Sequence, residues 1–226
     1  MKRITILLAE DHTILREGFR KVLELEDGLE VVGEAQEGRQ AVTLARKLRP
    51  DMVLMDIGMP LLNGLEATRQ ILKAVPNTRV LILSGHDDDA YVTNAIESGA
   101  AGFVLKQTSA HDVCRAIREV QKGNTFFSPS VAKHLQQQRE RKSPEQGGYL
   151  KWANENLTSR EMEVLQLVAE GKANKEIAVE LGISIKTVEK HRDHLMQKLN
   201  IHDTAGLTRY AISAGIIESS AFLATV

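Results

Sequence analysis

Charged or hydroxyl side chains directly follow short apolar runs at four places in the first half of the chain. Glu10 and Asp11 follow the first run, and Asp56 follows a later one. Ser84 and Lys106 follow two further runs. Burying a charge is unfavourable unless a partner compensates it. Each charged side chain therefore either leaves the core at the end of a strand or takes part in chemistry there.

The types of these side chains indicate phosphoryl chemistry on a carboxylate. Three carboxylates at one edge of a sheet repel one another unless a cation joins them, and oxygen ligands suit Mg²⁺. A carboxylate can attack phosphorus as a nucleophile. The new phosphoryl oxygens then need a lysine, a hydroxyl or a metal as partner. Taken singly, each residue has an ordinary explanation as a helix cap, a turn residue or a solvated charge, so the indication comes from the ordered set.

The elements that would position these residues alternate between strands and helices. Apolar runs predict strands, and apolar residues at helical spacing predict helices between and after them. Five strand–helix units in series predict a doubly wound parallel sheet with helices on both faces. Ligands of such sheets bind at the carboxyl ends of the strands. The predicted strands are 4–8, 29–35, 52–55, 79–83 and 102–105, and the predicted helices are 12–26, 38–48, 64–75, 89–98 and 109–122.

The alternation of strands and helices stops after this first part. The stretch "QQQRERKSPEQGG" is polar and contains a proline and paired glycines, which is typical of a linker. We predict an α/β domain over 1–125, a linker over 126–156 and a second domain over 157–226. The linker has room for a helix at its beginning, over 129–141.

The second domain is predicted to be all-helical, because residues 157–226 show no strand pattern. Thr158 and Glu161 have the spacing of a capping box at the start of a helix. Two further helices meet at Gly182, with Ser184 as the cap of the second, and a final short helix follows. Four short helices with a tight turn predict a helix-turn-helix module.

The composition is that of an ordinary globular protein, with 42% hydrophobic and 26% charged residues and a net charge of -1. The single cysteine, Cys114, excludes an internal disulfide and fits a reducing compartment. The apolar run near the start is too short for a signal peptide or a membrane span. We therefore expect a cytoplasmic protein with no membrane partner.

Four motifs give the chain a clear resemblance to a known family. "AEDH", "MDIGMP" followed by "NG", "LSG" and "GFVLK" stand in the order of the receiver motifs. The chain resembles a two-component response regulator of the NarL/FixJ type, with a flavodoxin-like receiver domain and a LuxR-type helix-turn-helix domain. This family is regulatory rather than enzymatic, with slow autodephosphorylation at most.

The resemblance implies a role for each residue of the first set. Asp56 is expected to accept a phosphoryl group from a sensor histidine kinase. The expected ligands of Mg²⁺ are Glu10, Asp11, Asp56 and the backbone carbonyl of Gly58. Ser84 and Lys106 are expected to contact the phosphoryl oxygens. Phe103 is expected to be the aromatic that changes rotamer. The chain departs from the commonest pattern at Glu10, where aspartate is frequent, and at Phe103, where tyrosine is common.

The helix predicted over 185–199 is expected to read double-stranded DNA. The resemblance implies DNA contacts from five of its residues, Lys186, Thr187, Lys190, His191 and Arg192. Residues 157–226 contain eight lysines and arginines but nine acids, and DNA affinity depends largely on cationic contacts. We therefore expect weak binding by a monomer. Phosphorylation is expected to release this helix and favour a homodimer on an inverted-repeat operator.

Two other classes of function fit parts of the sequence. A phosphatase of the haloacid-dehalogenase type would use Asp56 as its nucleophile, but such enzymes usually place a second acid two residues later, where this chain has Gly58. A constitutive DNA-binding protein would use its first domain only for protein contacts. The complete acidic set argues against this alternative, and phosphoryl uptake by Asp56 separates the three classes.

Overall fold

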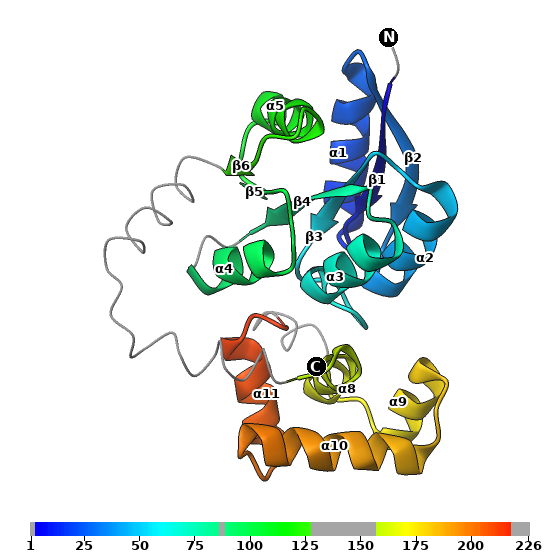
Figure 1. Ribbon diagram of the computed structural model, residues 1–226, viewed down its shortest axis with the longest axis vertical. Coiled ribbons are helices and arrows are strands. Elements are labelled where there is room, and N and C mark those ends of the chain that lie inside the picture. Colours follow the sequence, from blue (N-terminus) through cyan, green and yellow to red (C-terminus); the bar gives the residue numbers. More distant parts are fainter. Residues whose placement is uncertain (1–2, 86–88, 128–156, 218–226) are drawn as a thin grey trace. The chain divides into compact units, whose positions relative to one another are not determined.

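The computed structural model describes residues 3–85, 89–127 and 157–217 (Figure 1). These residues belong to two compact units, one within 1–141 and the other within 142–226. The linker helix predicted over 129–141 lies outside the described residues. No helix of the described ranges is long and apolar enough to cross a membrane.

The first unit contains a parallel sheet with the strand order β2-β1-β3-β4-β5-β6. The predicted doubly wound architecture is therefore confirmed. The sixth strand, β6, was not predicted, because two phenylalanines are too short a run to show a strand pattern. The strands are β1 (Ile4–Ala9), β2 (Leu29–Ala35), β3 (Met52–Asp56), β4 (Arg79–Ser84), β5 (Gly102–Leu105) and β6 (Phe126–Phe127).

Helices cover both faces of this sheet (Figure 1). One face packs against α1 and α5, and the other packs against α2, α3 and α4. Each predicted helix of this unit is present, with its ends within a residue or so of the prediction. The helices are α1 (Thr13–Leu25), α2 (Gly38–Leu48), α3 (Gly64–Ala74), α4 (Asp89–Glu97) and α5 (Ala110–Gln121).

Alternation along the central strands divides the core into two layers. In β1, Ile6 and Leu8 contribute to the layer below α1 and α5, whereas Leu7 and Ala9 contribute to the other. The same alternation runs through β3, which is buried along its whole length, and β1 is buried from Ile6 to Ala9. This explains why they have continuous apolar sequences. The rigid central strands then fix the positions of the polar residues at their ends.

The second unit is helical throughout its described part. Thr158 and Glu161 form the predicted capping box at the start of the first helix. Gly182 has a φ of 61°, which a glycine adopts without strain, and this allows the tight turn of the helix-turn-helix. The helices are α8 (Ser159–Ala169), α9 (Asn174–Leu181), α10 (Ile185–Leu199) and α11 (Thr204–Ser213).

Candidate functional site

The strand order brings the predicted polar residues together at one edge of the sheet. β1 and β3 are neighbours, so Glu10 and Asp11, just past β1, lie beside Asp56 at the end of β3. Ser84 ends the next strand, β4, and Lys106 follows β5. The chain leaves β1 toward β2 on one side, while β3 lies on the other. The site is therefore at the point where the strand order reverses, the usual ligand site of such sheets.

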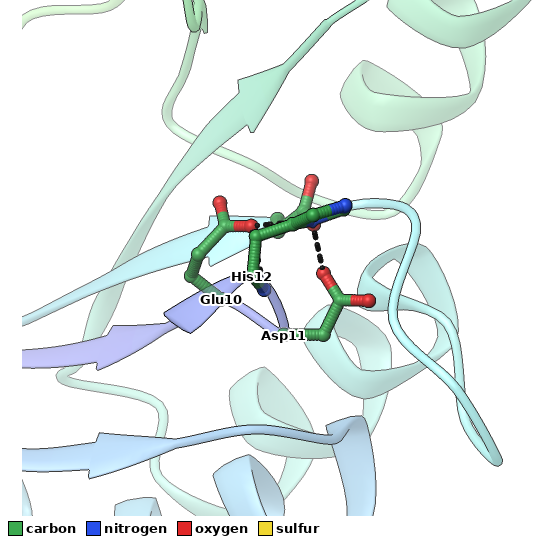
Figure 2. Close-up of side chains that lie close together, drawn as sticks. Glu10, Asp11 and His12 are labelled. Carbon is green, nitrogen blue, oxygen red and sulfur yellow. Dashed lines mark hydrogen bonds and ion pairs between the residues drawn. The ribbon is translucent and has the colours of Figure 1, made fainter. Parts of the chain in front are cut away.

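Four side chains form a compact cluster of potential metal ligands. Glu10, Asp11, His12 and Asp56 each offer one ligand atom, and these atoms all lie within 4.8 Å of one another. Figure 2 shows the His12 ring between the carboxylates of Glu10 and Asp11. Its Nδ1 atom lies 2.8 Å from Asp11 Oδ1 and 3.1 Å from Glu10 Oε1. His12 was not predicted as a member of this site, although its place directly after the two acids was a usable signal.

Lys106 provides a positive charge inside this cluster. Its Nζ atom lies 2.9 Å from Glu10 Oε2 and 2.9 Å from Asp56 Oδ1. Burial lowers the pKa of Lys106, but the charges of Asp56 and Glu10 outweigh that effect, so its pKa is raised. The lysine therefore stays protonated between the two buried carboxylates.

One lysine does not compensate for the concentration of negative charge. Burial, together with the charge of Glu10, raises the pKa of Asp56 to about 7, and Lys106 only partly opposes this. Burial lowers the pKa of His12, yet Asp11 and Glu10 raise it more, so its net shift is upward. Both shifts indicate a site whose electrostatic energy falls when positive charge is added.

The donor atoms of the cluster fit a hard divalent cation. Within the described part of the chain, Glu10 Oε2 and Asp56 Oδ1 are buried without a hydrogen bond, and Lys106 meets them only as an ion-pair partner. Carboxylate and carbonyl oxygens are the ligands that Mg²⁺ prefers. Gly58, two residues beyond Asp56, is only partly buried, which leaves its backbone open to solvent. The residues present are therefore consistent with a magnesium site.

The loop between β3 and α3 depends on a close backbone contact. A Cβ atom on Gly64 would lie only 1.8 Å from the carbonyl oxygen of Asp56, so no other residue fits there without displacing the strand end. The Gly64 amide also donates to the Ile57 carbonyl at 2.9 Å. Leu61 has a φ of 64°, and the next amide donates back to the Pro60 carbonyl at 2.7 Å, as in a γ-turn. Gly64 thus anchors a tight loop directly against the predicted phosphorylation site.

Ser84 and Phe103 lie on neighbouring strands close to this edge. Ser84 is 2% exposed and pairs in register with Leu105. Phe103 is fully buried and belongs to the core layer below α2, α3 and α4. The ring therefore points inward, and a change of its rotamer stays a prediction.

The helix α10 separates its predicted DNA contacts into two groups. Lys186 and Lys190 are exposed, whereas Thr187, His191 and Arg192 are partly buried. Val188, Leu195 and Leu199 form the buried face of the helix, as its apolar spacing predicted. Exposed acids, Glu189 and Asp193, accompany the two lysines.

Arg192 makes contacts within its own unit. Its guanidinium donates from Nη1 to Asn174 Oδ1 and from Nη2 to Thr204 Oγ1, each at 2.9 Å. These partners are the first residues of α9 and α11. Arg192 therefore connects three helices, a role that the sequence did not reveal.

Burial and the nearby charge of Arg160 lower the pKa of His191.

Comparisons with known proteins match both units. The "Response regulator receiver domain" family matches residues 6–118, and "Bacterial regulatory proteins, luxR family" matches residues 155–211. The chain is 37% identical over 227 residues to the transcriptional regulatory protein DegU of Brevibacillus brevis, covering 96% of each chain. It is also similar to the two-component response regulator RcsB in complex with DNA, at 29% identity and a TM-score of 0.59, covering 94% of this chain and 99% of that one. A structure of two RcsB dimers bound to two parallel DNAs gives 28% identity and a TM-score of 0.58 over the same shares.

Proposed function

We propose, from the premise that this chain belongs to the two-component response regulators and joins a receiver domain to a LuxR-type DNA-binding domain, that phosphorylation of Asp56 controls its action on DNA. One observation carries the proposal. Asp56 is a buried carboxylate at the end of β3 that lies beside two further acids and within ion-pair distance of Lys106. Members of this family are regulators and not conventional enzymes, so the phosphoryl group acts as a signal.

Glu10, Asp11 and Asp56, together with the backbone carbonyl of Gly58, would hold Mg²⁺ in this proposal. When bound, the ion supplies positive charge next to the acids and to the phosphoryl group. The raised pKa of Asp56 supports this assignment, because burial and then the charge of Glu10 make its carboxylate charge costly without a cation. The acids themselves keep the nucleophilic oxygen fixed at the end of a rigid strand.

In the transfer step, an oxygen of Asp56 attacks the phosphorus of a phosphohistidine on a sensor histidine kinase. The new O–P bond forms an acyl phosphate, and the P–N bond breaks with its electron pair left on the histidine nitrogen. Lys106 and Ser84 then contact the phosphoryl oxygens. Lys106 Nζ already lies 2.9 Å from Asp56 Oδ1, which is the position of a partner for that charge.

The response that we propose passes from Ser84 and Phe103 to the oligomeric state. Their movement favours a homodimer and releases α10 to bind an inverted-repeat operator. The DNA contacts in this proposal are Lys186, Thr187, Lys190, His191 and Arg192. Support comes from the related RcsB, which has been solved both with DNA and as dimers on DNA.

Phosphoryl uptake is tested with acetyl phosphate and Mg²⁺ on the full-length protein. Mass spectrometry should find one phosphoryl group, on Asp56, and neither Asp56→Asn nor EDTA-treated protein should carry it. Sedimentation and DNA binding should change together after phosphorylation. Uptake by the Asp56→Asn variant would refute the assignment of the acceptor, and unchanged sedimentation with unchanged DNA binding would refute the proposed response.

The assignment of DNA contacts is tested by pairing two variants of α10. Lys190→Ala should weaken binding to the operator, by about 1–3 kcal/mol if the lysine contacts a base, and leave the melting temperature unchanged because Lys190 is exposed. Arg192→Ala should lower the melting temperature as well, because it loses its bonds to Asn174 and Thr204. If Lys190→Ala and Lys186→Ala both bind like the parent, α10 is not the reading helix.

A further inference from the structure

Arg16, in the first turns of α1, is a buried arginine next to the acidic cluster. Its exposed fraction is 6%, which is rare for an arginine without partners. Its Nη1 atom donates to the carbonyl oxygen of Glu10 at 2.8 Å and to that of Asp11 at 3.3 Å. The guanidinium of Arg16 therefore contacts the backbone of both Glu10 and Asp11, the two acidic residues shortly before α1.

The segment that Arg16 contacts lies just beyond the last residue of β1. The Glu10 amide still donates to the Ala35 carbonyl of β2 at 3.0 Å, and this contact continues the pairing of β1. Beyond it, His12 occupies the N-cap of α1 without a side-chain capping bond. Each of the two carbonyls that Arg16 contacts belongs to the same residue as one of the carboxylates. A rotation of that backbone would therefore move the carboxylates relative to Asp56.

A counterion lets the arginine stay buried at this place. Arg16 Nε lies 3.3 Å from Glu34 Oε2 on β2, the strand beside β1. Glu34 also meets Arg20, from the next turn of α1, at 2.8 Å. Arg20 is half exposed, and the hydrogen bonds found for its side chain go to Glu24 and Glu34. Arg16 and Arg20 therefore share a counterion, but Arg16 alone of the two donates to the carbonyls of Glu10 and Asp11.

We infer that Arg16 is a positioning residue of the metal site, which sets Glu10 and Asp11 for a divalent cation by holding their backbone carbonyls. The inference rests on the proposed Mg²⁺ site. Residues that orient metal ligands from behind typically change metal affinity 10–100-fold when they are replaced. An arginine that only stabilised the fold would change the melting temperature and leave the affinity of the folded protein for Mg²⁺ intact.

The test is a titration of the full-length protein with MgCl₂, followed by ¹H–¹⁵N NMR at the amides of Glu10, Asp11 and Asp56. Arg16→Met should weaken Mg²⁺ binding about tenfold. Arg16→Lys keeps the charge but has one donor nitrogen in place of the guanidinium fork. Its affinity for Mg²⁺ should lie between that of Arg16→Met and that of the parent. Arg20→Met is the matched control, because it removes a partner of Glu34 without touching the carbonyls, and its dissociation constant should stay within about twofold of the parent.

The outcomes separate this inference from the function on which it rests. If Asp11→Asn binds Mg²⁺ like the parent, the proposed metal site itself is wrong. If Asp11→Asn loses Mg²⁺ binding while both Arg16 variants keep the parental dissociation constant, only the role of Arg16 is overturned. An equal loss of Mg²⁺ affinity in Arg20→Met would assign the effect to the charge of Glu34. Failure of both Arg16 variants to fold would show that Arg16 serves the stability of the domain. Either result would overturn the inference.

Discussion

Replacing Asp56 with asparagine should stabilise the receiver domain, and the gain should grow with pH. Asp56 is 1% exposed, and the pKa of its side chain is raised from 3.8 to about 7, first by burial and then by the charge of Glu10. A raised pKa means that the native state favours the protonated acid. Below pH 4 the acid is protonated in both the folded and unfolded states, so it carries no penalty there. As the pH rises through 7, the native state must hold the charge and loses stability relative to the unfolded chain.

The size of this penalty follows from the shift. A pKa difference of one unit corresponds to 1.36 kcal/mol, so a shift of about three units corresponds to about 4 kcal/mol above pH 7. Between pH 5 and pH 7 the penalty grows by about 1.4 kcal/mol per pH unit. Asparagine removes the charge but also the partner of Lys106. We therefore expect a net gain of about 1–3 kcal/mol at pH 8 and a clearly smaller gain at pH 5.

Calorimetric unfolding of the full-length protein without added divalent metal measures this difference. A gain of 1 kcal/mol corresponds to a rise of about 2–8 °C in melting temperature for domains of this size range. Asp51, at the other end of β3, supplies the control, because its Oδ2 accepts from the amide and hydroxyl of Thr5 at 3.0 and 2.8 Å. Asp51→Asn should not stabilise the protein at either pH. A gain for Asp56→Asn that is absent at pH 8, or equal at pH 5 and pH 8, would falsify the electrostatic explanation.

Two further predictions concern glycines and one concerns the lysine of the site. Gly64→Ala should destabilise the receiver by several kcal/mol, on the order of the cost of overpacking, because its Cβ would lie 1.8 Å from the Asp56 carbonyl; thermal unfolding measures this. Gly18→Ala, at an exposed helical position with no atom within 4 Å of the new Cβ, should instead raise stability by about 1 kcal/mol. Equal effects of the two alanines would contradict the close-contact argument. Lys106→Ala should still accept a phosphoryl group at Asp56, but its DNA binding should respond less to phosphorylation, measured as the ratio of operator affinities with and without acetyl phosphate.

The sequence was sufficient for the receiver fold because its central strands are buried on both faces. Such strands appear as continuous apolar runs, and β3 and β4 were predicted to within one residue of their observed ends. The same pattern also predicted that the acids meet at one edge of the sheet, because the carboxyl ends of parallel strands all lie on the same side. β6 was not predicted because it is only two residues long. Its pairing with β5, in which Phe126 lies opposite Gly102, depends on the neighbouring strand and not on a pattern in the sequence of β6.

The roles of two arginines could not be predicted from the sequence. Arg16 and Arg192 both occupy ordinary positions on amphipathic helices, where an arginine is most often solvated. Each has a partner that is distant in the chain: Glu34 is the counterion that lets Arg16 stay buried, and Asn174 accepts a hydrogen bond from Arg192. A periodicity argument places a residue on a face of a helix, but it does not show which carbonyl or carboxylate the fold brings opposite that face.

Phosphorylation would add negative charge at a place where the folded receiver already holds charge at a cost. A ligand or modification can shift an equilibrium only by the difference in its interaction with the two states. Ionising Asp56 costs about 4 kcal/mol in the folded state relative to the unfolded chain by its pKa shift, first through burial and then through the charge of Glu10. A modification that adds negative charge there would need positive or hydrogen-bond-donating partners, and Lys106 Nζ already lies 2.9 Å from Asp56 Oδ1. The same cluster that lowers the stability of the unmodified domain would therefore make that domain responsive to the phosphorylation that we propose for Asp56.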